Sequence, residues 1–550
     1  MIKVYNTLSR QKEDFVPVQT PTGNKRPVGM YLCGPTVYKP SHIGHMVGPV
    51  IFDCIKRYLV YNGYDVTFVV NITDVDDKLI NESNARHMSM ADLASEMTQD
   101  YLSNIKALGV DSIDHFPHAT EYIPQIIKFV NDLVDKGVAY ESDGDVYFDV
   151  AKFPEYGKLS NRSVDQMIGE GGSTAQRKHS AADFALWKSA KPGEPSWDSP
   201  WGPGRPGWHI ECSVMGSCLL GDTFDIHGGG LDLQFPHHEN EIAQSEARSG
   251  KPYVKYWMHN GLMQASDEVG KVGGRKTKSA DGTENSSNGS AEGSAVGSEP
   301  APTAGDYASQ EAGKISKSKG AAAFRDMLKT FAGETIRFFL LSTHYRRPID
   351  YSIRRIQEVQ TGLDAFYRFF KRFDRLTGQN FYQLDFAKVR DAGDFTADPS
   401  NALLVSVLDS RKRFLDGMDD DFNTGAGIAE LFDLVKKLNK FVDDQKLEVA
   451  DKNSDLFKAD CAQLVQGARV FRELAGSLGL FLVPPVKSGE TQEEDTSTVD
   501  GLMGLIIEIR ANAKKNKDWA TADLIRDRLK ELSIKLEDRP DKTTGWEKIQ

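Results

Sequence analysis

Two histidines and a glycine lie at the junction between an expected strand and the expected helix that follows it. The apolar run Val28–Cys33 stops at Gly34-Pro35, and the segment His42-Ile43-Gly44-His45 follows after a short loop. Val47–Tyr61 then carries apolar residues at roughly helical spacing, and a second apolar run, Val66–Ile72, comes next. This order predicts a strand–helix–strand unit of a doubly wound parallel sheet. Backbone N–H groups and the helix dipole at such a junction face a nucleotide phosphate, so the imidazoles and the glycine are candidates for nucleotide binding.

A second motif, Lys314-Ile315-Ser316-Lys317-Ser318, lies far along the chain. Alone it would most often be an ordinary solvated basic loop. Paired with the histidine motif, it resembles the KMSKS signature that accompanies HIGH in class I aminoacyl-tRNA synthetases, with Ile315 where the signature has Met. Four further segments resemble the cysteinyl-tRNA synthetase family, and the resemblance covers nearly the whole chain: Cys33–Tyr38, Asn71–Lys78, Gly207–Ser213 and Phe224–Ala247.

The resemblance implies a ligase reaction in two steps. The carboxylate of L-cysteine attacks the α-phosphate of ATP, which gives cysteinyl-adenylate and pyrophosphate. Cysteine is then transferred to the 3′-terminal adenosine of tRNA(Cys), by class analogy at the 2′ hydroxyl. Positioning and charge stabilisation carry such chemistry. The resemblance implies that His42, His45, Lys314 and Lys317 are catalytic and that Gly44, His42, His45 and Lys317 bind ATP, which enters with Mg²⁺.

The amino-acid pocket is implied by the same resemblance. Asp232 is expected to hold the substrate ammonium, and His227 and Trp208 to engage its carboxylate end, with Thr73 beside them. The alternative is that Asp232 is a turn residue after the glycine run and that the aromatic residues are core packing.

His237 and Glu241 are four residues apart in a helical pattern, which predicts that they share one helix face. The resemblance implies that they bind one Zn²⁺ per chain together with Cys33 and Cys212, a donor set that suits this ion. Taken singly, each cysteine is more often a small buried hydrophobe, and such a histidine–glutamate pair is often a surface feature. Zinc would distinguish the thiol of cysteine from the hydroxyl of serine, which an apolar pocket does poorly.

The fold expected from these features is α/β: a Rossmann-like doubly wound parallel sheet with a connective insertion, followed by an α-helical bundle and a small C-terminal α/β domain. The segment Ala265–Gly313 contains no Leu, Ile, Phe, Trp or Met and is predicted to be disordered. The two halves of the catalytic domain are expected at residues 1–117 and 207–264, with the connective insertion at 118–206 between them. The low-complexity insertion follows at 265–313, and the lysine loop and stem-contact region at 314–350. The tRNA-binding bundle is expected at 351–485, a linker at 486–498, and an anticodon-binding domain at 499–550.

Contacts with tRNA are expected mainly from the last domain, where basic residues lie on two predicted helices. Leu536–Trp546 resembles the family's anticodon-reading module. Lysines would contact phosphates without reading sequence, and aspartates would accept hydrogen bonds from base edges. Lys514, Asp523 and Asp538 are the named candidates, although a charged helix face is the commoner meaning of such a pattern.

The bulk composition is that of a soluble protein of several domains. The formal net charge of −12 does not by itself favour a nucleic-acid partner, so local basic faces are required. The 5 cysteines form no CxxC pair, which fits a reducing cytoplasm. We expect a cytoplasmic monomer with tRNA(Cys), L-cysteine and ATP as partners and no membrane association.

Two other functions share some of these features. A ligase of the same fold that transfers activated cysteine to a small amine, as in the mycothiol pathway, would have the same motifs and zinc set, but Phe324–Gln550 favours tRNA. A zinc-containing RNA-binding protein with an inactive nucleotide site is disfavoured by the intact histidine motif and both motif lysines. A hydrolytic zinc enzyme fits poorly, because four protein ligands leave the metal a vacancy only for a displaced or added sulfur.

Overall fold

The computed structural model describes residues 1–19, 26–162, 177–265, 323–390, 398–485, 496–539 and 543–548. The predicted insertion beyond Ala265, the motif lysines Lys314 and Lys317, and residues 486–495 of the predicted linker lie outside these ranges. Within them, no helix has the length and apolar character needed to span a bilayer.

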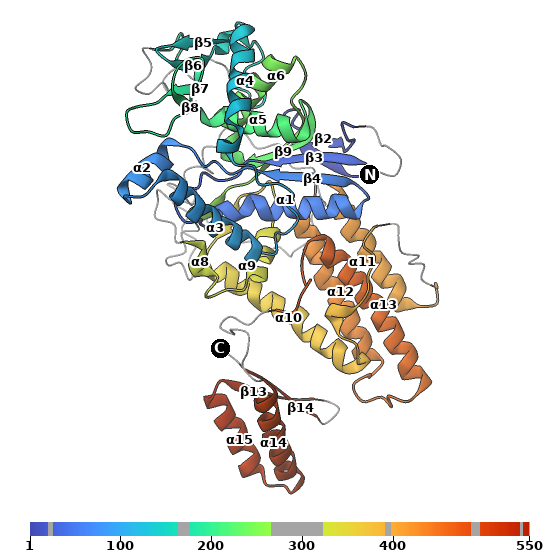
Figure 1. Cartoon of the computed structure of the whole chain (residues 1–550). Helices are drawn as coiled ribbons and strands as arrows, with labels where there is room; N and C mark the ends of the chain where they lie inside the picture. The colour runs from blue at the N-terminus through green and yellow to red at the C-terminus, as the bar shows by residue number, and fades with distance from the viewer. Residues whose placement is uncertain are drawn as a thin grey trace, which may run out of the picture.

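The centre of the catalytic domain is a four-stranded parallel sheet (Figure 1). Its strands are buried along most of their length, as expected when helices cover both faces of a parallel sheet. Cys33 and Gly34 follow directly after one of the two central strands, at the carboxyl edge of the sheet. The strand order is β10 (Val254–Asn260), β9 (Phe224–Gly230), β3 (Pro27–Leu32) and β4 (Asp65–Val70).

Helices lie on both sides of this sheet, which confirms the predicted doubly wound fold. Helix α1 (Gly44–Tyr61) connects β3 to β4 and covers one face, and α5 (Trp208–Leu220) covers the other (Figure 1). The pattern that predicted a helix over Val47–Tyr61 is confirmed. The remaining elements of this part are β1 (Lys3–Asn6), β2 (Gln11–Asp14), α2 (Asp77–Ala85), α3 (Met90–Ala107), η6 (Gln234–His238) and α6 (Glu239–Ser249).

The segment between the two halves of the sheet forms its own layer. It begins with η1 (Ala119–Tyr122) and α4 (Ile123–Asp135) and continues as an antiparallel sheet with its own apolar core. Asp143 and Gly144 have φ of 54° and 80°, so the first two strands form the predicted tight hairpin. The strands are β5 (Ala139–Ser142), β6 (Asp145–Phe148), β7 (Phe184–Ser189) and β8 (Gly204–Pro206).

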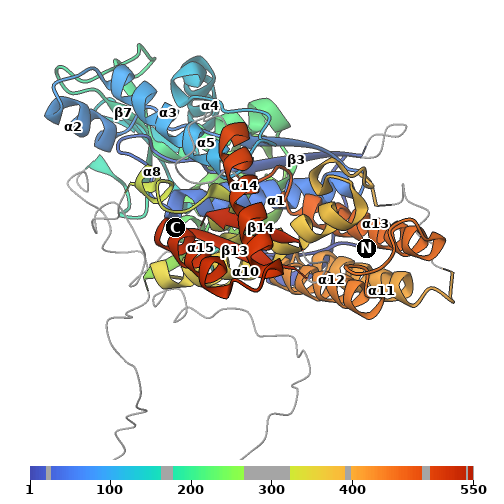
Figure 2. The same ribbon diagram turned by 90° about the horizontal axis from the view of Figure 1, so that it is seen from below.

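A helical region follows, and its apolar spacing of three and four residues predicts its helices to within a few residues. Buried phenylalanines from α10 and α13, including Phe366, Phe370 and Phe471, meet in its core. Figure 2 shows this bundle and the connective layer at opposite ends of the molecule. The elements are β11 (Met263–Ala265), α8 (Phe324–Met327), α9 (Gly333–Leu341), β12 (Ile349–Tyr351), α10 (Ile353–Thr377), η8 (Phe381–Gln383), α11 (Ala402–Asp419), α12 (Thr424–Asp444) and α13 (Asp455–Ser477).

The C-terminal module lies below the rest of the chain in Figure 1. Two antiparallel helices, α14 (Thr496–Lys515) and α15 (Trp519–Glu531), are followed by the antiparallel strands β13 (Ile534–Asp538) and β14 (Thr544–Lys548). Helix α14 starts inside the segment predicted as linker.

One buried guanidinium joins the catalytic layer to the bundle. Arg337 on α9 forms an ion pair with Asp53 of α1 and donates to the carbonyl oxygens of Leu478 (2.8 Å) and Leu108 (3.3 Å). Asp53 is fully buried and also accepts from Arg57 Nε at 2.8 Å. Burial alone would raise the pKa of Asp53, but the two guanidinium groups lower it below its ordinary value, so the carboxylate stays charged.

We expect Arg337→Met to lower the stability of this body by about 3–5 kcal/mol, because it removes one partner of a buried ion pair and leaves carbonyl oxygens without donors. Urea denaturation followed by circular dichroism measures the change. Arg354→Ala, which removes an exposed ion pair with Glu358 on α10, is the control and should cost less than about 1 kcal/mol. Equal losses in the two variants would refute the role given to Arg337.

Candidate functional site

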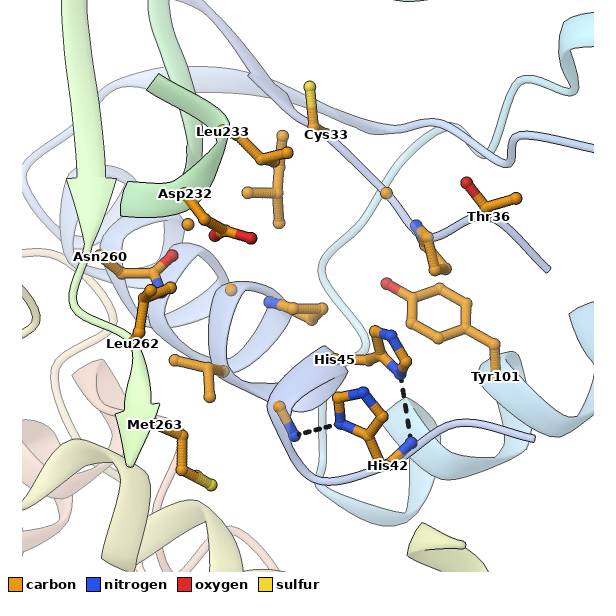
Figure 3. Close-up of a pocket in the computed structure, with 18 of the residues that line it drawn as sticks. Cys33, Thr36, His42, His45, Tyr101, Asp232, Leu233, Asn260, Leu262 and Met263 are labelled. Atoms are coloured by element: carbon orange, nitrogen blue, oxygen red, sulfur yellow. Dashed lines mark hydrogen bonds between the residues drawn. The ribbon is translucent and has the colours of Figure 1, made fainter. Parts of the chain in front are cut away.

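A pocket of 430 Å³ opens at the carboxyl ends of the central strands. His42 and His45 lie on one side of it, and Asp232, Asn260 and Leu262 lie on the other (Figure 3). This is the edge at which ligands bind in doubly wound sheets. Its volume is within the range of small-molecule sites.

The imidazoles of His42 and His45 are held in a defined proton state by the first turn of α1. His42 Nδ1 accepts from the backbone N–H of Gly44 (3.1 Å), and His45 Nδ1 accepts from the N–H of His42 (3.2 Å). The ring centroids are 3.8 Å apart. Because each Nδ1 accepts, a neutral ring carries its proton on Nε2. Both rings therefore present a donor nitrogen beside an N-terminus that attracts anions.

Four side chains that could ligate a metal gather beside this pocket from four separate elements, and Cys33 is the one that lines it. Cys33 follows β3, Cys212 lies on α5, His237 lies in the irregular turn η6, and Glu241 lies in the first turn of α6. One ligand atom from each lies within 4.8 Å of the others. The segment η6 runs directly into α6 with helical dihedrals at His238 and Glu239, and His237 and Glu241 lie 3.1 Å apart at the i,i+4 spacing, as the predicted shared helix face requires.

The distances between these donors match a tetrahedral metal site. Cys33 Sγ lies 3.8 Å from Cys212 Sγ and 3.5 Å from Glu241 Oε1. A tetrahedral ion with metal–sulfur bonds of about 2.3 Å and metal–oxygen bonds of about 2.1 Å places two sulfurs about 3.8 Å apart, and sulfur and oxygen about 3.6 Å apart. His237 Nε2 is 3.1 Å from Glu241 Oε1, and among the described residues it has no hydrogen-bond partner. A buried nitrogen in that state fits metal ligation.

The electrostatics of the cluster lead to the same conclusion. Burial disfavours charge on Cys212, but the hydrogen bond from Cys33 and the proximity of His237 lower its pKa to about 6. Burial and the neighbouring sulfur raise the pKa of Cys33. At Glu241, His227 and His237 outweigh burial and lower the pKa to about 2. Burial also opposes charge on His237, yet Glu241 and Cys212 raise its pKa to about 10. The anionic pair thus draws a proton onto His237, where a metal ion would supply the positive charge instead.

Two further histidines contact the cluster: His227, which was predicted to engage the substrate, and His209, which was not predicted as a site residue. His209 Nδ1 lies 2.8 Å from His237 Nδ1, and His227 Nε2 lies 2.9 Å from Glu241 Oε2. Such outer contacts fix the rotamer and tautomer of ligands. His227 and His238 also form an alternative ligand group with Cys33 and Glu241. We favour the group that contains both sulfurs, since its donor distances fit a tetrahedron. The only sequence signal for His209 is its position one helical turn before Cys212.

The residues predicted for the amino-acid pocket divide into two pairs. Trp208 and Asp232 line the pocket, and the Trp208 ring, which is 39% exposed, stacks on His237 with centroids 4.3 Å apart. Thr73 and His227 are buried and are not among the lining residues. Thr73 Oγ1 donates to Glu211 Oε2 at 3.0 Å, and His227 contacts Glu241. Thr73 and His227 therefore support the wall of the pocket.

The residues predicted to contact tRNA bond to one another or to near neighbours in the C-terminal module. Lys514 Nζ lies 2.6 Å from Asp538 Oδ2, and Arg510 Nη1 lies 2.7 Å from Oδ1 of the same carboxylate. These partners hold the pKa of Asp538 well below its ordinary value. Asp523 is exposed and pairs with Arg526 at 3.0 Å. Asp538 thus already ties β13 to α14, whereas Asp523 stays on the surface.

Comparison with known proteins agrees with this arrangement. Residues 19–272 match the family model described as the catalytic domain of class I (C) tRNA synthetases, and residues 413–482 match the DALR domain. The structure is similar to Mycobacterium tuberculosis methionyl-tRNA synthetase bound by methionyl-adenylate, with a TM-score of 0.55 and 15% identity, over 82% of this chain and 90% of that one. The fold and the site thus define a class I aminoacyl-tRNA synthetase.

Relatives over the full length identify the family within that class. The cysteine–tRNA ligase of Heliobacterium modesticaldum is 42% identical over 100% of this chain and 99% of its own. That of Thermodesulfovibrio yellowstonii is 40% identical over 100% of both chains. The chain belongs to the cysteine–tRNA ligase family.

We expect the purified protein to carry about one tightly bound transition-metal ion per chain, and Cys212→Ser to remove most of it, because a hydroxyl is a poor replacement for a thiolate ligand. Plasma mass spectrometry of the dialysed proteins measures the content. Cys218→Ser is the control, since Cys218 lies on the same helix but is exposed. Equal metal content in the two variants would exclude Cys212 as a ligand.

Proposed function

We propose that the protein activates L-cysteine with ATP to cysteinyl-adenylate and pyrophosphate and transfers cysteine to the 3′-terminal adenosine of tRNA(Cys). The observation that carries the proposal is that one pocket joins two sites: His42 and His45 line it, and so does Cys33, through which the pocket reaches the Cys33–Cys212–His237–Glu241 cluster. The first suits a nucleotide phosphate, and the second suits a thiol. Full-length similarity to cysteine–tRNA ligases supports the same reaction.

In the first step, the chain positions the reactants and offsets charge. The Nε2–H groups of His42 and His45, with the N-terminus of α1, would donate to phosphate oxygens, and Gly44 leaves room for the nucleotide. Lys314 and Lys317, which lie outside the described residues, would neutralise charge on the leaving pyrophosphate of Mg²⁺-bound ATP. Low local dielectric strengthens each of these interactions.

Selection of cysteine is assigned to the ligand cluster. A Zn²⁺ ion held by Cys33, Cys212, His237 and Glu241 would supply a soft site for the substrate thiolate, which the hydroxyl of serine fills poorly. Trp208 covers His237 and limits access of water to the cluster. Asp232 would hold the substrate ammonium, while Thr73 and His227 keep the wall in place. This division of roles makes a separate editing site unnecessary.

The remainder of the chain is assigned to tRNA. We infer that the bundle at 351–485 holds the body of the tRNA and that the module at 499–550 reaches the anticodon, with Lys514 and Asp523 as contacts and Asp538 as a support for them. The catalytic halves at 1–117 and 207–264, the insertion at 118–206 and the loop region at 314–350 would hold the acceptor end. We further propose that the protein acts as a monomer in the cytoplasm.

The proposal is tested by cysteine-dependent exchange of pyrophosphate into ATP, with serine as the control amino acid and with charging of tRNA(Cys) measured in parallel. We expect exchange with cysteine, exchange at least about 100-fold weaker with serine, and charging of the tRNA. Exchange without charging would instead support a ligase that uses a small amine. No exchange by metal-replete protein would refute the proposal.

We expect His45→Ala to slow exchange by about 10²-fold or more, because it removes a donor aimed at charge that develops in the transition state. The loss should appear in kcat with metal content unchanged. His179→Ala, in the exposed part of the connective layer, should leave exchange within about twofold of the unmodified protein. Equal activity in the two variants would remove His45 from the catalytic machinery.

A further inference from the structure

The end of α1 that lies away from the pocket is bonded to the helical bundle. The buried Tyr61 hydroxyl donates to Glu473 of α13, and Arg411 of α11 donates to the Tyr61 oxygen at 3.0 Å. Arg411 also donates to Glu473 Oε1 from Nε (3.0 Å) and from Nη2 (2.6 Å). Tyr61 therefore completes a charged hydrogen-bond cluster that unites three helices.

A second set of bonds lies one turn earlier on α1. Tyr58, which is fully buried, donates to Asp419 at the end of α11 (2.6 Å). Arg390 bonds Asp419 at 2.9 Å, and its backbone N–H donates to Tyr61 O at 2.8 Å. We call Tyr58, Tyr61, Arg390, Arg411, Asp419 and Glu473 the α1 clamp.

The two ends of α1 thus belong to different functional regions. Gly44 and His45, at its start, line the nucleotide pocket. The clamp holds its last turn against α11 and α13. An α-helix of 18 residues is about 27 Å long and transmits orientation along its axis. The direction of the bundle relative to the pocket is therefore set by this helix and its clamp.

We propose that Tyr61 is a positioning residue for the transfer step, one that aligns the tRNA-binding bundle with the adenylate pocket. The inference rests on the proposed function. Adenylate formation needs only small substrates, which reach the pocket without the bundle. Transfer needs the 3′-terminal hydroxyl, which is carried on a molecule held by the bundle, at the reacting carbonyl. Misplacement by about 1 Å costs such a step up to about 100-fold.

Tyr61→Phe removes the hydroxyl that bonds Glu473 and Arg411 and changes little else, because Glu473 keeps its bonds to Arg411. Tyr367→Phe is the matched control. Tyr367 also donates to a glutamate, the half-buried Glu334, at 2.6 Å, but that bond joins α10 to α9 and does not involve α1. Loss of folding stability should therefore be similar in the two variants. Only Tyr61→Phe should change how the bundle is aligned with α1.

The experiment measures three quantities in the full-length protein: pyrophosphate exchange, the Kd for tRNA(Cys), and the single-turnover rate of transfer from preformed adenylate. For Tyr61→Phe we expect exchange and Kd within about twofold of the unmodified protein and transfer slower by at least about tenfold. Tyr367→Phe should leave all three unchanged. Tyr58→Phe, which removes the bond to Asp419, should repeat the transfer defect.

A purely structural role would slow exchange and transfer together, or would affect Tyr61→Phe and Tyr367→Phe alike, and either result would overturn the inference. Unchanged transfer in Tyr61→Phe would also overturn it. Failure of the proposed function is distinguishable, since the unmodified protein would then show no cysteine-dependent exchange at all.

Discussion

The buried ion pair between Arg337 and Asp53 anchors helix α1, which carries His45 and begins two residues after His42, so both imidazoles of the pocket lie at its start. The guanidinium has bonds to α1, to the end of α3 and to the end of α13, so together with the α1 clamp it holds the catalytic layer against the bundle. A charge pair in a dry interior tolerates little displacement, because a lost bond leaves an uncompensated charge. The pocket therefore gets its rigidity from a contact that is remote from it in sequence.

The Cys33–Cys212–His237–Glu241 cluster depends on a different kind of interaction from the Arg337–Asp53 ion pair. Two thiols, an imidazole and a carboxylate are packed within a few ångströms in a buried space, and such a set of donors needs compensating positive charge. His209 and His227 hold the imidazole and the carboxylate in place, which reduces the freedom of the site to adapt to a harder ligand. Under the proposed function, specificity for cysteine would depend on how rigidly the protein holds these donors as well as on which donors it has.

The acidic net charge of the chain is compatible with a polyanionic partner, because some basic residues are tied up in internal ion pairs while others remain exposed. In the C-terminal module, Arg510 and Lys514 are neutralised by Asp538, which makes them part of the module's own framework. Arg526 and Arg528 are exposed, with only surface ion pairs to near neighbours. Exposed pairs are weak and are readily exchanged for a phosphate. A salt-sensitive tRNA interface would be built on residues of this second kind.

The sequence by itself determined the class of fold, the histidine motif at the start of α1, the hairpin at Asp143-Gly144 and the helices of the bundle. These features depend on local periodicity and on turn chemistry, which neighbouring residues alone decide. Resemblance also brought Cys33, Cys212, His237 and Glu241 together. Only the tertiary structure decided that Thr73 and His227 stand behind the pocket wall, that Asp538 is engaged internally, and that His209, Arg337 and Tyr61 bond to residues of other elements. Contacts between residues so far apart in the chain leave no local pattern, because they arise from how whole elements pack against one another.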